Sequence, residues 1–130
     1  MKNSENSSEK EIVGRTFRFA VDVVHFCHQL DQQPGVGRVL MSQIVRSGTS
    51  VGSNVEEAQA AESRADFVSK MSIALKEALE TNFRLRVLHS AGLPKAVPPD
   101  ALVSSRTQSV AFLGLSSLPP KALENLRPNF

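Results

Sequence analysis

Apolar residues recur at steps of three and four positions along most of the chain before residue 92, which is the period of an amphipathic helix. The pattern predicts three helices: from about Glu11 to Leu30, from Val36 or Arg38 to Ala61, and from about Arg64 to Ala91. Turn-forming proline and glycine residues separate the first helix from the second and follow the third. An all-α fold is therefore favoured.

The first predicted helix carries an unusually wide apolar surface, made of two stripes about a third of a turn apart. One stripe consists of Val13, Phe17, Ala20, Val24 and Cys27, and the other of Phe19, Val23, Phe26 and Leu30. A single neighbouring helix does not cover half of a helix circumference, so this helix either lies between two neighbours or contributes to a subunit interface. We predict that the second stripe is the subunit interface.

The second and third predicted helices are joined by a turn with a clear cap. Ser63 and Asp66 have the N-cap and N3 spacing of a capping box, and Gly92 is a C′ glycine that ends the third helix. Gly48 and Gly52 each weaken the second helix by about 1 kcal/mol relative to alanine. We expect a kink there or the close approach of a neighbouring backbone. The expected core positions are Val39, Leu40, Ile44, Val51, Val55 and Ala58, followed by Phe67, Met71, Ala74, Leu75, Ala78, Leu85 and Leu88.

The helical signal weakens after Gly92, where prolines and serines accumulate. A short, divergent fourth helix is predicted from Pro98 to about Leu115. The expected fold is an antiparallel up-down-up-down four-helix bundle over residues 11–118, with a flexible N-terminus at 1–10 and a C-terminal tail at 119–130. The absence of Trp and Tyr, with 41% hydrophobic residues, suits helix packing better than a β-sandwich.

Composition narrows the class of protein further. The 130 residues make one domain, and the lone Cys27 cannot form an intramolecular disulfide. The polar N-terminus lacks the apolar run of a signal peptide, and no later run is long enough to span a membrane. We expect a cytoplasmic protein without membrane contact.

Two patterns in the sequence contain the residue types of catalytic or metal sites. Gly48-Thr-Ser50-Val-Gly52 matches the nucleophile elbow G-x-S-x-G, but the elbow needs a preceding β-strand, so a serine hydrolase using Ser50 is the remotest alternative. His25, Cys27 and His28 are metal-ligand types that fall on different helix faces. We predict no metal, no cofactor and no catalytic residue.

A polar ladder runs along the second predicted helix: Arg46, Ser50, Asn54 and Glu57. Antiparallel packing of the third helix would bring Glu77 or Lys76 toward its upper end. The ladder is either a binding groove or a buried hydrogen-bond network that fixes the pairing of the two helices, and the network is the favoured interpretation.

The basic residues are scattered among acidic ones, and the net charge of +2 permits nucleic-acid binding without requiring it. The chain has no Tyr or Trp, and we expect no exposed Phe, so no stacking platform for single strands is predicted. Binding would then rest on phosphate contacts and weaken steeply with salt. Assembly of several copies would align basic side chains from different subunits.

The central stretch resembles a known bacterial family. The segments Arg46–Ala58, Ser63–Phe67 and Met71–Ala78 are similar to the four-helix-bundle family named after proteins encoded in 23S ribosomal RNA intervening sequences, with coverage from about Val13 to Pro94. Many members carry proline where this chain has glycine at position 52. The positions that match the family motif, taken as fold or interface residues, are Arg46, Ser50, Asn54, Glu57, Ser63, Phe67 and Glu77.

The resemblance implies a bundle that assembles as a homo-oligomer, a pentameric ring in known relatives, and no catalytic residues. A related branch serves the reverse transcriptases of diversity-generating retroelements as an accessory protein that binds RNA. We therefore predict a non-enzymatic, self-assembling scaffold associated with RNA or a nucleic-acid-processing protein, with a protein–protein adaptor as the alternative. The candidate nucleic-acid contacts are Arg15, Arg18, Arg84 and Arg86. The Ser- and Pro-rich end departs from the family's long charged fourth helix.

Overall fold

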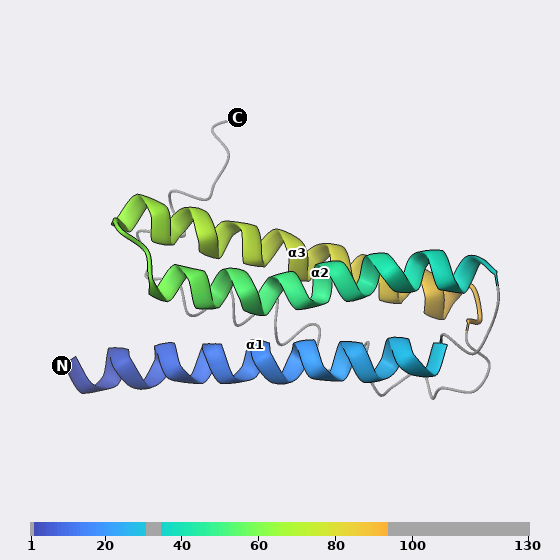
Figure 1. Ribbon diagram of the computed structural model, residues 1–130, viewed down its shortest axis with the longest axis horizontal. Coiled ribbons are helices and arrows are strands. Elements are labelled where there is room, and N and C mark those ends of the chain that lie inside the picture. Colours follow the sequence, from blue (N-terminus) through green and yellow to red (C-terminus); the bar gives the residue numbers. More distant parts are fainter. Residues whose placement is uncertain (1, 31–34, 94–130) are drawn as a thin grey trace.

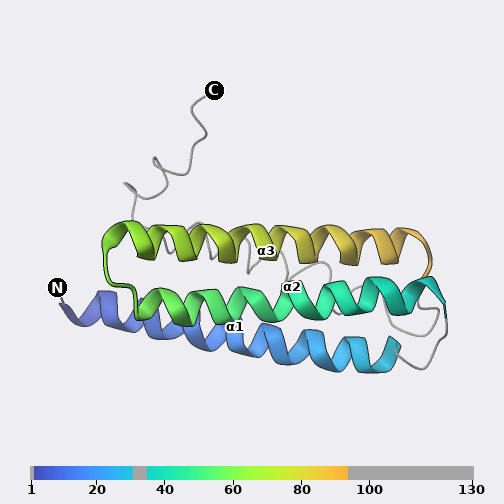
Figure 2. The ribbon, with the colours of Figure 1, turned by 45° about the horizontal axis from the view of Figure 1, so that its top comes forward.

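The computed structural model describes residues 2–30 and 35–93, and its side chains from residue 10 onward except those of 29 and 30. It contains α1 (Lys2–Leu30), α2 (Val36–Gln59) and α3 (Arg64–Ser90), with no strand in these ranges. Consecutive helices run antiparallel to each other, and α2 packs against both α1 and α3 (Figures 1 and 2). The predicted fourth helix and C-terminal tail lie outside the described residues.

The first helix is longer than predicted, whereas the other two end close to where the pattern placed them. α1 begins at Lys2 rather than near Glu11. No proline or glycine occurs between Lys2 and Val13, so nothing in this polar segment interrupts a helix that continues into the apolar stripes.

The predicted caps of α3 are present, with one correction. The Ser63 hydroxyl accepts a hydrogen bond from the backbone N–H of Asp66 at 3.1 Å. The Asp66 carboxylate accepts from the N–H of Glu62 at 3.3 Å, one residue before the expected cap position. At the other end, Gly92 has a φ of +71°, and the N–H of Leu93 donates to the carbonyl of Leu88. This is a Schellman ending.

The core forms where α2 meets its two neighbours, and most of the predicted positions are buried in it. Val39 is the exception, with 62% of its surface exposed. It precedes the partly buried Leu40 by one residue and therefore points about 100° away from the line of core residues. The buried core residues of α2 and α3 are Ile44, Val51, Val55, Ala58, Met71, Ala74, Ala78, Leu85 and Leu88.

The second apolar stripe of α1 lies in the core of the chain, together with Cys27 of the first stripe. The buried core includes the stripe that we assigned to a subunit interface: Phe19, Val23 and Phe26. The side chain of Leu30 lies outside the described residues. From the remaining apolar surface of α1, Phe17 is 60% exposed and Val24 is 45% exposed. The wide apolar arc thus serves the core on one side and faces solvent on the other.

The two glycines of α2 mark the close approach of α1. A Cβ on Gly48 would lie 2.8 Å from Cγ1 of Val23, and a Cβ on Gly52 would lie 3.2 Å from the carbonyl oxygen of Thr16. α2 is one continuous helix through both positions. Gly52 shows the expected close approach of a neighbouring backbone, whereas Gly48 leaves room for the side chain of Val23.

Candidate functional site

The upper part of the polar ladder is an ion-pair cluster that joins α2 to α3. Nη2 of Arg46 lies 3.0 Å from both carboxylate oxygens of Glu80, and Nη1 lies 3.4 Å from Glu77. Arg84 approaches the same Glu80 at 2.6 Å. Partial desolvation raises the pKa of Glu80, but hydrogen bonds and charge from Arg84 and Arg46 outweigh it and hold that pKa below its usual range. The expected contact of Glu77 with the ladder is confirmed, whereas Lys76 is exposed.

The rest of the ladder is also satisfied within the chain. Ser50 donates to the carbonyl of Arg46 at 2.7 Å, and Asn54 donates to the carbonyl of Ser50 at 2.8 Å. Glu57 pairs with Lys70 of α3 at 2.6 Å, and this hydrogen bond raises the pKa of the lysine. Arg46 and Glu57 thus join α2 to α3 as the network interpretation predicted, whereas Ser50 and Asn54 bond to the backbone of their own helix. The network is not buried, since Arg46 is 53% exposed.

A buried polar contact that the sequence pattern did not predict lies beside the ladder. Ser47 and Thr81 have no exposed surface, and their hydroxyl oxygens lie 2.7 Å apart across the α2–α3 contact. Thr81 also bonds to the carbonyl of Glu77 at 2.8 Å. Ser47 lies three residues after the predicted core residue Ile44 and four before Val51, so helical spacing placed it on the core side, but only the facing helix reveals its partner.

We expect Thr81→Val to lower the free energy of unfolding by about 1–2 kcal/mol, because it leaves the Ser47 hydroxyl buried with only the carbonyl of Ile44 at 3.4 Å. Urea denaturation measures this loss. Thr49→Val is the matched control, since Thr49 bonds to the carbonyl of Val45 on its own helix. An equal effect of both substitutions would show that the contact between the helices contributes nothing.

The remaining motif residues have structural positions. Ser63 caps α3, and Phe67 packs partly buried against the core cluster that contains Val55 and Met71. Ser50 lies in the middle of α2, where no strand precedes it and its hydroxyl is bonded to the backbone. A nucleophile elbow requires a strand–turn–helix, so this surrounding geometry contradicts the hydrolase alternative.

The three metal-ligand types of α1 are separated as their helical positions predicted. Cys27 is buried, whereas His25 and His28 are exposed. In the part of the chain that the structure describes, no group of three or more His, Cys, Asp or Glu side chains is arranged to hold a metal ion. The absence of a bound metal remains a prediction.

Two of the four candidate nucleic-acid contacts are held in ion pairs by acidic residues of their own helix. Arg15 is paired with Glu11, and Arg84 with Glu80. Arg18 and Arg86 are exposed and form no ion pair within the described residues. Phe17 and Phe83 are 60% and 59% exposed, which corrects the expectation that no phenylalanine would be exposed.

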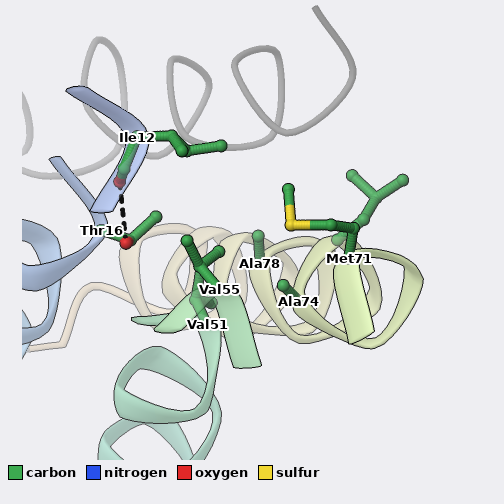
Figure 3. Close-up of a pocket in the computed structure, with 8 residues that line it drawn as sticks. Ile12, Thr16, Val51, Val55, Met71, Ala74 and Ala78 are labelled. Atoms are coloured by element: carbon green, nitrogen blue, oxygen red, sulfur yellow. Dashed lines mark hydrogen bonds between the residues drawn. The ribbon is translucent and has the colours of Figure 1, made fainter. Parts of the chain in front are cut away.

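A small apolar hollow lies between α1 and α3 above α2. Ile12 and Thr16 face Met71, Ala74 and Ala78 across it (Figure 3). The Thr16 hydroxyl donates to the carbonyl of Ile12 at 2.9 Å and so offers no free proton to a ligand. A space of about 10 Å³ with apolar walls holds at most one water molecule, so it is not a substrate pocket.

No helix among the described residues is both long enough and apolar enough to cross a membrane.

Comparisons with known proteins agree on one group. The model of the 23S rRNA-intervening sequence protein family matches residues 8–100. A crystal structure from Bacteroides thetaiotaomicron VPI-5482, described as a protein of unknown function from the S23 ribosomal protein family, is similar with a TM-score of 0.73 and 33% identity. The match covers 84% of this chain and 96% of that one. No curated protein matches the chain.

Proposed function

The chain belongs to the 23S rRNA-intervening sequence protein family, and from this premise we propose that it is a non-enzymatic, self-assembling scaffold that associates with RNA or ribonucleoprotein. The observation that carries the proposal is the exposed apolar side of α1, where Phe17 is 60%, Val24 45% and Val21 37% exposed. Contiguous apolar surface of this kind is typical of protein interaction sites. A second copy of the chain is the proposed occupant, in a ring of five subunits.

A fourth helix is part of the same proposal. The sequence predicts it from Pro98 to about Leu115, and the hollow between α1 and α3 is apolar on the side of Ile12, Met71 and Leu75. If the apolar side of this short helix packs along the hollow, an antiparallel four-helix bundle is complete.

The RNA part of the proposal rests on charge. The chain has a net charge of +2 and an isoelectric point of about 9.0. Arg18 and Arg86 are exposed without an ion-pair partner in the described ranges, so they are available for phosphate groups. A ring of subunits repeats each such arginine and multiplies the weak positive field of one copy.

Native mass spectrometry of protein purified at low salt without nuclease tests assembly and RNA association in one spectrum. We expect a pentamer that carries RNA. Phe17→Asp should reduce the mass toward the monomer, because it places a charge in the proposed contact. Val39→Asp is the matched control, since Val39 is 62% exposed on a different helix.

Each part of the proposal fails on a distinct result. A wild-type monomer at micromolar concentration would refute the assembly. A pentamer that carries no RNA, and whose mass spectrum does not change on charge reversal at Arg15 and Arg18, would favour the protein–protein adaptor instead.

A further inference from the structure

One outer face of α3 combines exposed apolar and basic side chains. At the period of the α-helix, its members fall within about 100° of arc. They are Lys76, Leu79, Phe83, Arg86 and Val87. Phe83 is 59% exposed, Leu79 53% and Val87 40%, and both basic residues are exposed. We call this set the Phe83 face.

The aromatic ring and a guanidinium group are already held together on this face. The central guanidinium carbon of Arg86 lies over the ring of Phe83, 6.0 Å from its centroid. Nε of Arg86 donates to Oδ1 of Asn82 at 2.9 Å, which fixes the guanidinium near the ring. An aromatic face and an arginine plane are the two protein surfaces on which nucleic-acid bases stack.

The charge on the Phe83 face suits phosphate groups. No acidic residue of α3 lies within the arc of this face. Glu80 lies at its border toward α2 and is neutralised by Arg46 and Arg84. Lys76, which precedes Phe83 in α3, and Arg86, which follows it, have no ion pair within the described ranges. Both cations are therefore available to a polyanion.

We propose that the Phe83 face is a stacking site for an unpaired base of single-stranded RNA, in which Phe83 and Arg86 hold the base while Lys76 and Arg86 meet the neighbouring phosphates. This inference rests on the RNA association proposed above and names its ligand class. Phenylalanine and arginine are also enriched in protein interfaces, whereas lysine is depleted there, so Lys76 is the residue that favours a nucleic acid over a protein partner.

Fluorescence anisotropy with a short labelled oligouridylate and a labelled RNA duplex of equal length tests the site. We expect Phe83→Leu to weaken single-strand binding about tenfold, because leucine offers no aromatic face on which a base can stack. Duplex binding should not change, since its bases are already stacked. Phe83→Tyr should retain the affinity of the wild type.

Two further variants separate stacking from general effects. Val39→Ala is the control, since Val39 is 62% exposed on α2 and belongs neither to the Phe83 face nor to the exposed apolar side of α1. It should leave single-strand binding unchanged. Arg86→Gln should lower the slope of log affinity against log salt by about one.

The outcomes distinguish this inference from the function on which it rests. If the wild type binds neither RNA, both are wrong. If Phe83→Leu and the wild type bind the oligouridylate equally, RNA association stands and the stacking site is refuted. If Phe83→Leu changes the oligomeric mass while RNA affinity is retained, the face is a protein contact and the proposal is overturned.

Discussion

Gly48→Val is expected to lower the free energy of unfolding by about 3 kcal/mol. A Cβ at this position would lie 2.8 Å from Cγ1 and 3.0 Å from Cγ2 of Val23. Val23 is fully buried and, as a β-branched residue, has little rotamer freedom with which to move away. Overpacking of this kind typically costs about 1–3 kcal/mol, and the further methyl groups of valine place this change at the upper end.

Equilibrium urea denaturation with an unchanged m-value measures the loss at Gly48. Gly37→Val is the matched control, because a Cβ there meets nothing within 4 Å. Its stability should stay within about 0.5 kcal/mol of the wild type. The double variant Gly48→Val/Val23→Ala should recover part of the loss, since Val23→Ala removes the atoms in conflict. Strictly additive effects would mean that the two positions do not press on each other.

Cys27 is expected to make the folded protein sensitive to alkaline pH. Desolvation by burial raises the pKa of its thiol from 9.0 to about 11. The thiol also lies 3.7 Å from the carbonyl of Met41, to which it donates. Because the folded state holds this proton more tightly than the unfolded state, the stabilisation is complete below pH 9.0 and is lost as the pH rises toward about 11. A two-unit shift corresponds to at most about 2.7 kcal/mol.

Comparison of the wild type with Cys27→Ala isolates this effect. The alanine variant loses a constant amount through truncation, and the difference between the two stability curves should shrink between pH 9 and 11. The same shift leaves about 100-fold less thiolate near pH 8, so iodoacetamide should modify the folded protein far more slowly than the urea-unfolded chain. Equal alkylation rates in the two states would contradict the burial of Cys27.

The proposed assembly and the core compete for the apolar surface of α1. Sequence periodicity revealed that this surface is too wide for one neighbour, but both stripes have the same spacing and similar residues. Phe19 and Phe17 differ by two positions, and only the packing of α2 decides that Phe19 is buried and Phe17 exposed. The number of apolar faces was therefore predictable, whereas their assignment was not.

The candidate site divides in the same way. Helical spacing alone placed Arg46, Ser50, Asn54 and Glu57 on one face of α2. Antiparallel packing through the Ser63 turn predicted a contact with Glu77 or Lys76, of which the structure shows Glu77. The convergence of Arg46 and Arg84 on Glu80, and the buried pair Ser47–Thr81, depend on the rotation of α3 about its own axis. Glu77 and Glu80 lie about one turn apart on α3, and the local sequence does not determine which of them contacts Arg46.

The sequence by itself determined the three described helices to within a few residues, except at the start of α1. It also determined the capped turn at Ser63, the ending at Gly92 and most of the core. These features depend on hydrogen bonds and apolar spacing within about two turns of chain, which any part of a sequence carries locally. Only the tertiary structure decided that Gly48 lies against Val23 with no room for a side chain, which phenylalanines are exposed to solvent, and that Arg86 lies over Phe83. Those outcomes depend on the distance and rotation between surfaces, which no single helix specifies.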